Sequence, residues 1–291
     1  MNNLFLKGCS TALATPFLED GSVDYDSYAS LLDRQVAAGV DFLTVLATTA
    51  ETPTLSLEEK KKLLAISKEH CGGLPLLVGC GSNSVAATLE NIRQLPGADA
   101  YLVVVPFYNK PTQEGMYLYF KAIAEAAQAP VVIYNVPGRT GANMLASTAM
   151  RLAREVPGII GIKEASGKMD QCREIIDGAP QGFSVLSGDD DMTFELIKAG
   201  GDGVISVASN ALPREVSLMC HLALEGQFAQ ASALNDKLLP LMKGCFIESN
   251  PIPVKAALAE LGLCKAGVRI PLTEATEQTK QTIREILKEW K

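Results

Sequence analysis

The stretch Gly158-Ile-Ile-Gly-Ile-Lys-Glu-Ala-Ser-Gly167 is a short apolar run that ends in a lysine. Consecutive aliphatic residues are typical of a strand whose two faces are both buried, as in a parallel sheet. A lysine that closes such a strand brings an amine to the sheet edge where α/β proteins form their sites. The stretch therefore predicts a parallel sheet and one candidate functional residue, Lys163.

Further apolar runs resemble this one, and stretches with the period of an amphipathic helix lie between them. The helical stretch at residues 57–70 also follows Ser56, with Glu59 three positions on, which is a capping-box pattern. Alternation of strands and helices predicts a parallel sheet. The expected strands are residues 11–14, 42–46, 75–79, 100–105, 131–134, 159–163, 184–186 and 203–207.

The number of strand–helix units indicates how the sheet is completed. Eight units fit an α/β fold of the (β/α)8 TIM barrel type, although periodicity alone leaves an open doubly wound sheet as an alternative. We expect the barrel at residues 1–224 and a C-terminal helical extension at residues 225–291, within the same structural unit. The helical stretches at the C-terminal end are residues 213–224, 227–243, 254–261 and 274–291.

The composition excludes several classes of partner. The 291 residues are 47% hydrophobic and 20% charged, as in ordinary globular proteins. A net charge of −7, with scattered Lys and Arg, argues against nucleic acid or an anionic membrane as partner. No run approaches the roughly 20 apolar residues of a transmembrane helix, and the start of the chain lacks a secretory pattern. We expect a cytoplasmic protein with reduced cysteines.

Two residues at the ends of neighbouring strands are candidates for catalysis. An amine taken out of water without a counter-ion favours its neutral form, which can attack a carbonyl carbon. Lys163 is such a candidate nucleophile, unless it forms an ion pair with an acid such as Glu164. Tyr134 ends the preceding strand, and its phenol can donate and accept protons beside the lysine. A tyrosine there can equally serve packing alone.

Polar residues follow other strands as well. Thr48 and Thr49 come after residues 42–46, and their hydroxyl and backbone N–H groups can bind a carboxylate or relay a proton, although such residues also form simple turns. Arg139 follows the turn pair Pro137-Gly138, and its guanidinium suits a second carboxylate, unless it is only a surface residue.

The sequence offers little for metal or nucleotide chemistry. The two histidines, His70 and His221, lie in helical stretches far apart, which disfavours a metal site or a catalytic triad. Asp189, Asp190 and Asp191 precede a helical run, where the helix dipole favours acids, so a cation site there is the weaker interpretation. No nucleotide-binding glycine motif is present. We therefore expect no metal and no cofactor.

Several motifs in order resemble the dihydrodipicolinate synthase and N-acetylneuraminate lyase family of Schiff-base barrels, and the resemblance spans nearly the whole chain. The motifs are Ala14-Thr-Pro-Phe17, Thr48-Thr-Ala-Glu51, Val104-Val-Pro-Phe-Tyr-Asn-Lys-Pro111, Tyr134-Asn-Val-Pro-Gly-Arg-Thr-Gly141, Gly161-Ile-Lys-Glu-Ala-Ser-Gly167, Leu186-Ser-Gly-Asp-Asp190, Gly203-Val-Ile-Ser-Val207 and Asn250-Pro-Ile-Pro-Val-Lys255.

The resemblance implies an activity and a set of roles. The activity is the condensation of pyruvate with L-aspartate 4-semialdehyde at the entry to lysine and diaminopimelate synthesis. It implies that Lys163 forms an imine with pyruvate and that the chain forms a homotetramer, a dimer of dimers. It implies proton transfer by Tyr134, by Thr48 and by Tyr108, which would reach into a neighbouring subunit. It implies pyruvate binding by Thr49 and by the backbone of Ile205. It also implies that Arg139 binds the semialdehyde.

Some positions depart from the family pattern. Ala47 and Ala50 stand where glycines are usual, which adds two methyl groups near the pyruvate pocket. Members that lysine inhibits carry polar residues at four positions that here hold Leu57, Lys60, Ala87 and Phe107. We therefore expect little inhibition by millimolar lysine.

Two other activities share the lysine, the tyrosine and the pyruvate pocket: N-acetylneuraminate lyase and keto-deoxy sugar acid aldolase. Arg139 favours a semialdehyde carboxylate over a sialic acid. From another class, a catalytically inactive barrel that serves as a binding protein would have lost Lys163, Tyr134 or Thr48, and all three are present.

Overall fold

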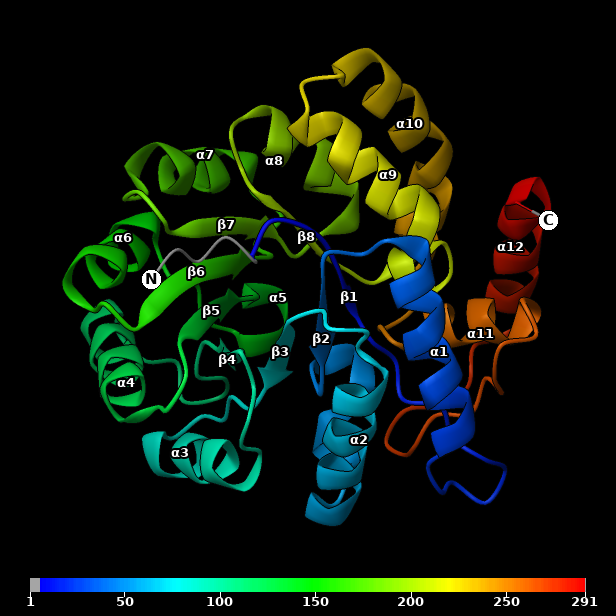
Figure 1. The fold of residues 1–291 in the computed structure, drawn as a ribbon, viewed down its shortest axis with the longest axis horizontal. Coiled ribbons are helices and arrows are strands. Elements are labelled where there is room, and N and C mark those ends of the chain that lie inside the picture. Colours follow the sequence, from blue (N-terminus) through cyan, green and yellow to red (C-terminus); the bar gives the residue numbers. More distant parts are fainter. Residues whose placement is uncertain (1–5, 291) are drawn as a thin grey trace.

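A computed structural model describes residues 6–290 and contains a closed barrel of parallel strands (Figure 1). Each strand pairs with the next in the chain, and β1 pairs with β8, with Ser10 opposite Ile205. This last pairing closes the sheet, so the predicted TIM barrel is confirmed and the open doubly wound alternative is wrong. The strands are β1 (Gly8–Ala12), β2 (Phe42–Val45), β3 (Leu76–Gly79), β4 (Ala100–Val104), β5 (Val131–Asn135), β6 (Ile159–Glu164), β7 (Ser184–Ser187) and β8 (Gly203–Ser206).

Two glycines allow the barrel to close. Gly8 and Gly203 are paired across the β1–β8 seam, and both have positive φ angles, of 95° and 143°. A Cβ atom on Gly203 would stand 1.9 Å from the backbone oxygen of Gly8. Only glycine combines this close approach with such backbone angles.

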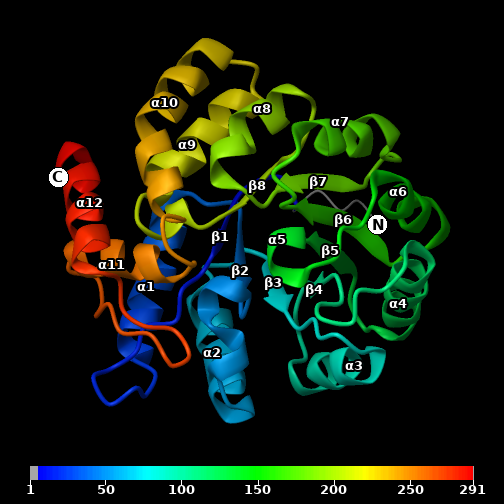
Figure 2. The ribbon, with the colours of Figure 1, turned by 180° about the vertical axis from the view of Figure 1, so that it is seen from behind.

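Helices surround the barrel and connect its strands (Figures 1 and 2). Short helical turns follow the carboxyl ends of several strands: η1 (Thr48–Ala50) and η2 (Thr52–Thr54) after β2, α5 (Pro137–Thr140) after β5, η3 (Asp190–Met192) after β7 and η4 (Ala208–Asn210) after β8. The outer ring consists of α1 (Tyr25–Ala38), α2 (Leu57–His70), α3 (Val85–Gln94), α4 (Gln113–Ala126), α6 (Ala146–Glu155), α7 (Met169–Gly178), α8 (Thr193–Lys198) and α9 (Pro213–Leu224).

The start of α2 shows how local sequence sets an element. The Ser56 hydroxyl accepts a hydrogen bond from the Glu59 backbone N–H at 3.2 Å, and the Glu59 carboxylate accepts one from the Ser56 N–H at 2.8 Å. The predicted capping box is therefore confirmed. Strand β1 instead begins three residues before its predicted start at Thr11, because Gly8, Cys9 and Ser10 are too small or polar to register as an apolar run.

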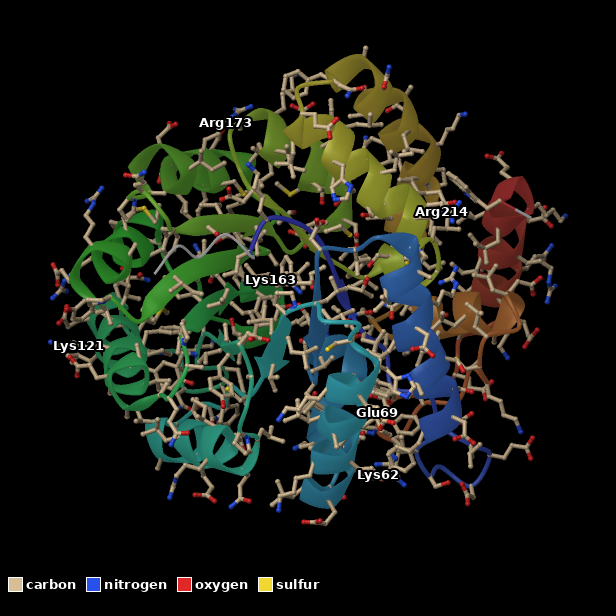
Figure 3. All side chains as sticks on the ribbon, in the orientation of Figure 1. Lys62, Glu69, Lys121, Lys163, Arg173 and Arg214 are labelled. Atoms are coloured by element: carbon tan, nitrogen blue, oxygen red, sulfur yellow. The ribbon has the colours of Figure 1, made fainter. Side chains whose placement is uncertain are left out.

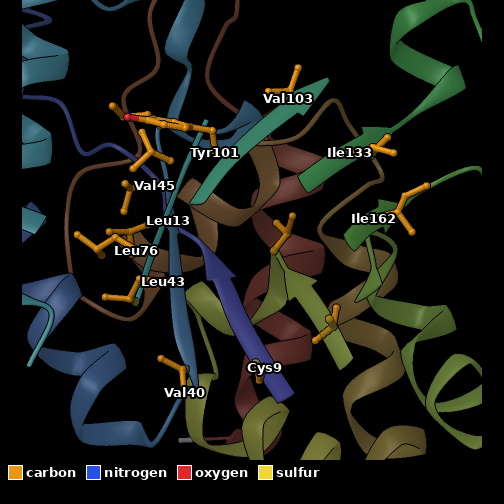
Figure 4. Close-up of a cluster of buried hydrophobic side chains, with 14 of the residues drawn as sticks. Cys9, Leu13, Val40, Leu43, Val45, Leu76, Tyr101, Val103, Ile133 and Ile162 are labelled. Atoms are coloured by element: carbon orange, nitrogen blue, oxygen red, sulfur yellow. The ribbon is translucent and has the colours of Figure 1, made fainter. Parts of the chain in front are cut away.

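The core has two layers. Alternate strand residues point outward and pack against the ring helices, as Leu43, Val103 and Ile162 do in Figure 4. The opposite set fills the barrel interior, where Phe42, Leu77, Leu102 and Ile205 belong to one buried cluster. Polar side chains at the carboxyl ends of the strands therefore lie against a packed layer of apolar side chains.

Up to residue 290, where the described part of the chain ends, the C-terminal region contains the helices α10 (Phe228–Gly244), α11 (Ile252–Glu260) and α12 (Glu277–Leu287). Helix α10 packs on α9 and η3, and α11 packs on α12 and η4. The predicted last helix was too long, since α12 is followed by the short turn η5 (Lys288–Trp290), and residue 291 lies outside the described residues. The boundary between residues 224 and 225 stays a prediction. No helix within residues 6–290 is long and apolar enough to cross a membrane.

Candidate active site

Lys163 and Tyr134 are direct neighbours in the barrel. They are register partners on β6 and β5, so both side chains leave the sheet at the same height. The Lys163 side chain lies inside the ring of strands, whereas Lys121 and Arg173 lie on outer helices (Figure 3). Lys163 is only 4% exposed, and its Nζ atom lies 4.5 Å from the centre of the Tyr134 ring.

Lys163 forms no ion pair with Glu164, because the two side chains point to opposite sides of β6. Alternation along β6 turns Glu164 out of the barrel, where its carboxylate accepts hydrogen bonds from the Asn135 and Gln171 side-chain amides and from the Ser166 N–H. Burial raises the pKa of Glu164. No ion pair within residues 6–290 includes Lys163. The interpretation in which Lys163 pairs with Glu164 is therefore wrong.

A cavity of about 210 Å³ opens above the lysine. Five residues predicted from sequence meet there, although they lie on or after three different strands: Thr48, Thr49, Tyr134, Arg139 and Lys163. The other lining residues are Val136, Gly138, Ala165, Gly188, Asp189, Val207, Phe246 and Asn250.

The loop that carries Thr48 and Thr49 is held in place by contacts to Glu51. Glu51 ends η1 with a left-handed backbone, at a φ of 54°, and its carboxylate is buried. Lys255 of α11, whose side chain is fully buried, donates to that carboxylate at 2.8 Å, and the Arg269 N–H donates to its other oxygen at 2.9 Å. The C-terminal region thus anchors the loop that carries Thr48 and Thr49.

Asn250 is a site residue whose role is not predicted from the sequence. Its Nδ2 group donates to the Thr49 hydroxyl at 3.1 Å, and its backbone oxygen accepts from Arg139 at 3.2 Å. It therefore links a threonine after β2 with the arginine of α5. The motif that begins at Asn250 was the only signal of this role, because nothing local shows which strand ends it faces.

The three aspartates after β7 point in three directions. Asp189 lines the cavity, and burial raises its pKa to about 6 against the lowering effect of the Lys163 charge. Asp190 is buried and accepts from the Ser206 hydroxyl and the Val207 N–H, whereas Asp191 is exposed. Within residues 6–290, no three His, Cys, Asp or Glu side chains gather in a way that could hold a metal ion.

Two predicted site residues lie outside the cavity lining. The Tyr108 side chain is 88% exposed, on the loop between β4 and α4. Ile205 is fully buried in the barrel-interior cluster that also contains Tyr134 and Leu186. The structure of one chain therefore brings together five of the seven predicted site residues.

The fold and the cavity are those of an enzyme of the lyase type, a TIM barrel whose cavity is lined by a buried lysine. The chain belongs to the dihydrodipicolinate synthetase family, whose model matches residues 5–290.

Individual relatives agree with this assignment. A 4-hydroxy-tetrahydrodipicolinate synthase from Phocaeicola vulgatus is 51% identical over 289 residues, which cover 98% of this chain and 97% of the relative. Among solved structures, dihydrodipicolinate synthase from Thermotoga maritima has a TM-score of 0.96 at 44% identity, with 98% of each chain covered. A chloride-inhibited dihydrodipicolinate synthase from Acinetobacter baumannii, complexed with pyruvate, has a TM-score of 0.93 at 41% identity, again with 98% of each chain covered.

Proposed function

We propose that this chain condenses pyruvate with L-aspartate 4-semialdehyde to give 4-hydroxy-tetrahydrodipicolinate, the first committed step of lysine and diaminopimelate synthesis. The observation that carries the proposal is the Lys163 amine, which is buried beside the Tyr134 phenol and has no ion-pair partner in residues 6–290. The names of the relatives favour this activity over N-acetylneuraminate lyase and keto-deoxy sugar acid aldolase.

The first half of the reaction uses Lys163, Tyr134 and the two threonines of the cavity, together with the backbone of Ile205. The Lys163 amine attacks the pyruvate ketone, and loss of water gives a protonated imine. Thr49 binds the pyruvate carboxylate, and the backbone of Ile205 borders the pyruvate. Tyr134 and Thr48 move the protons that imine and enamine formation require. The imine acts as an electron sink, so the adjacent methyl group loses a proton and becomes the enamine carbon.

The second half of the reaction uses Arg139, which also lines the cavity. Arg139 binds the carboxylate of the semialdehyde, because its guanidinium can form two parallel hydrogen bonds with that group. The enamine carbon then attacks the aldehyde. The amine of the second substrate attacks the imine carbon, which closes the ring and releases Lys163. These steps use only groups of the protein, so we expect turnover without added metal or nucleotide.

We also propose a cytoplasmic homotetramer, built as a dimer of dimers. Its support is Tyr108, which the family resemblance assigns to the proton relay but which lies outside the cavity of its own chain, with its side chain 88% exposed. A neighbouring subunit would bring this phenol to the site that needs it. The mass of the protein in solution, measured by light scattering, tests the assembly.

Borohydride reduction in the presence of pyruvate tests the chemistry. We expect the mass of one reduced pyruvate on the peptide that contains Lys163, and no such mass in the Lys163→Met variant. Labelling elsewhere, or none, would refute the imine. A coupled assay with L-aspartate 4-semialdehyde then separates the synthase from the two lyases, which would instead cleave N-acetylneuraminate or a keto-deoxy sugar acid.

A further inference from the structure

The carboxyl end of β8 extends beyond its pairing with β7. The register between these two strands ends with Ser187 opposite Val204, and β7 itself ends at Ser187. On its other side, β8 stays paired with β1 as far as Ser206. The sheet therefore supports the last two residues of β8, Ile205 and Ser206, on one side only.

The Asp190 side chain supplies contacts on the other side. One of its carboxylate oxygens accepts a hydrogen bond from the Ser206 hydroxyl. The other oxygen accepts from the backbone N–H groups of Val207 at 2.8 Å and Ala208 at 3.2 Å. Asp190 lies in η3, the turn after β7, and is 1% exposed. Its carboxylate thus joins that turn to the end of β8 where the strand pairing has stopped.

This end of β8 forms one wall of the cavity. Within residues 6–290, the cavity lining includes Val207 but not Asp190. The mechanism proposed above also places the backbone of Ile205 against the pyruvate. On the basis of the proposed function, we propose that Asp190 is a positioning residue for pyruvate. It holds the end of β8 where Ile205 and Val207 border the substrate, and it does not touch the substrate itself.

The contacts of Asp190 restrict position more than charge. Two consecutive backbone N–H groups and one hydroxyl converge on a single carboxylate, which fixes its orientation. Burial raises the pKa of Asp190, and these hydrogen bonds act in the opposite direction. Lys163 and Tyr134 belong to β6 and β5 and are register partners of each other. Loss of the Asp190 contacts should therefore weaken pyruvate binding more than it impairs the reactivity of the lysine.

Borohydride labelling at a series of pyruvate concentrations separates binding from reactivity in the full-length variants. In Asp190→Ala, we expect the half-saturating pyruvate concentration to rise by about tenfold or more, because small misplacements of a binding wall are costly. The maximal rate of labelling should stay within about threefold, as expected when binding alone is lost. Asp190→Asn should largely restore pyruvate binding. Its amide oxygen can accept from both N–H groups, and its NH2 group can donate to the Ser206 oxygen.

Asp202 provides the matched control at the opposite end of the same two strands. It directly precedes β8, its carboxylate accepts from the Val185 N–H at 2.9 Å, and burial raises its pKa as well. Asp202→Ala should lower the stability but leave the half-saturating pyruvate concentration unchanged. Equal increases in Asp190→Ala and Asp202→Ala would indicate a general loosening of β7 and β8 and would overturn the proposal. An unchanged value in Asp190→Ala would overturn it too.

Ser206→Ala keeps the proposal testable if Asp190→Ala does not fold. It removes one hydroxyl and should raise the half-saturating concentration by about threefold, near the usual net value of one hydrogen bond. An unchanged value in Ser206→Ala would count against the positioning role. If Asp190→Asn were as impaired as Asp190→Ala, the charge of the carboxylate would matter and its hydrogen bonds would not, which would also overturn the proposal. Absence of labelling in the unmodified protein would instead refute the proposed function.

Discussion

Lys163 and Glu164 are adjacent in the sequence, yet their side chains have opposite surroundings. The strand period sends Lys163 into the barrel beside Tyr134, and it sends Glu164 into a group of amides between the strand and the helices. The arrangement separates the amine from the nearest carboxylate in the sequence. Lys163 therefore faces the cavity beside Tyr134 without an ion pair to Glu164.

The absence of a side chain at Gly188 leaves room for the Lys163 side chain. A Cβ atom at Gly188 would stand 3.0 Å from Lys163 Cε and 2.6 Å from Ala165 Cβ. We expect Gly188→Ala to displace the lysine and to slow borohydride labelling with pyruvate by about tenfold or more, since small misplacements of reacting groups are costly. The rate of labelling under limiting pyruvate measures this effect.

Gly138→Ala is the matched control, because Gly138 also lines the cavity but a Cβ atom there meets nothing within 4 Å. Labelling should proceed at the rate of the unmodified protein. If both alanines slow it equally, the general shape of the cavity matters and the contact with Lys163 does not.

How far the sequence predicts the site depends on where each residue lies. Lys163, Tyr134, Thr48 and Arg139 follow apolar runs, so a local pattern together with barrel geometry brings them to one end of the sheet. Asn250 stands 201 residues from Thr49, its hydrogen-bond partner, and follows no strand. Its placement depends on how α10 and α11 fold back over the barrel, which periodicity does not encode.

At the level of elements, the prediction works where neighbouring residues decide the structure. The predicted helix over residues 57–70 is confirmed to the residue as α2, because both halves of its capping box are local in sequence. The start of β1 was misplaced, because Gly8 and Cys9 are strand residues only through pairing with β8, about 195 positions away, and Ser10 pairs with both β8 and β2.

The Glu51–Lys255 ion pair joins the threonine loop to α11, and its loss should affect both stability and catalysis. Lys255→Met leaves the Glu51 carboxylate buried without a cation. We expect the free energy of unfolding to fall by about 3–5 kcal/mol, as for other buried pairs that lose one partner. Turnover should fall as well, since Thr48 and Thr49 lose their anchor. Urea unfolding and the coupled assay measure the two effects.

The exposed pair between Glu19 and Lys265 provides the comparison for that variant. Lys265→Met should leave the urea midpoint unchanged, because solvent screens such pairs. In the double variant Glu51→Gln, Lys255→Met, part of the lost stability should return, since no buried charge remains unpaired. A double variant less stable than Lys255→Met would contradict this account.

A second ion pair makes the opposite end of the barrel sensitive to pH. His221 of α9 contacts Asp41, just before β2, at 2.9 Å, and this hydrogen bond raises the pKa of His221. A histidine whose pKa is raised by folding stabilises the folded state fully at a pH below its pKa in the unfolded chain, which is near 6.5. This contribution disappears as the pH rises through the pKa that the histidine has in the folded state.

Thermal unfolding of His221→Gln across a range of pH tests this. The variant should melt below the unmodified protein at acid pH, and the difference should shrink as the pH rises above neutrality. Because the His221 side chain is 39% exposed, solvent screening keeps the difference small. A difference that stays constant with pH would show that the ring contributes through packing alone.

At the scale of the whole molecule, the helix surfaces that bear Leu57, Lys60 and Ala87 argue against lysine as an inhibitor. Ala87 is exposed and offers no charge to an ammonium group, while Leu57 and Phe107 present apolar side chains that are each 40% exposed. Lysine bound beside them would find no acidic partner for its ammonium groups among these residues. We expect the coupled assay to lose less than about half its rate at millimolar lysine. Strong inhibition there would show that other residues decide lysine binding.

The conformation of the loop that carries Tyr108 supports the proposal that a second chain completes each site. The Tyr108 N–H donates to the Thr140 backbone oxygen at 3.3 Å, and its φ angle of 70° is one that tyrosine rarely adopts. A conformation that costs energy, on an anchored backbone, holds the ring out in solvent, which suits a side chain that functions in another subunit. Tyr108→Phe and Tyr134→Phe should therefore each impair turnover, by removing different phenols of one proton relay.

Co-expression of these two variants with different tags tests that arrangement. In a hybrid dimer, the Tyr108→Phe chain keeps Tyr134 and receives Tyr108 from its partner, so one of its two sites is complete. Hybrids purified through both tags should regain up to about one half of the unmodified rate, since an isologous dimer has two such sites. If Tyr108 acted within its own chain, every site of the hybrid would lack one phenol. The hybrids would then be no faster than the parent variants, which would exclude a relay between subunits.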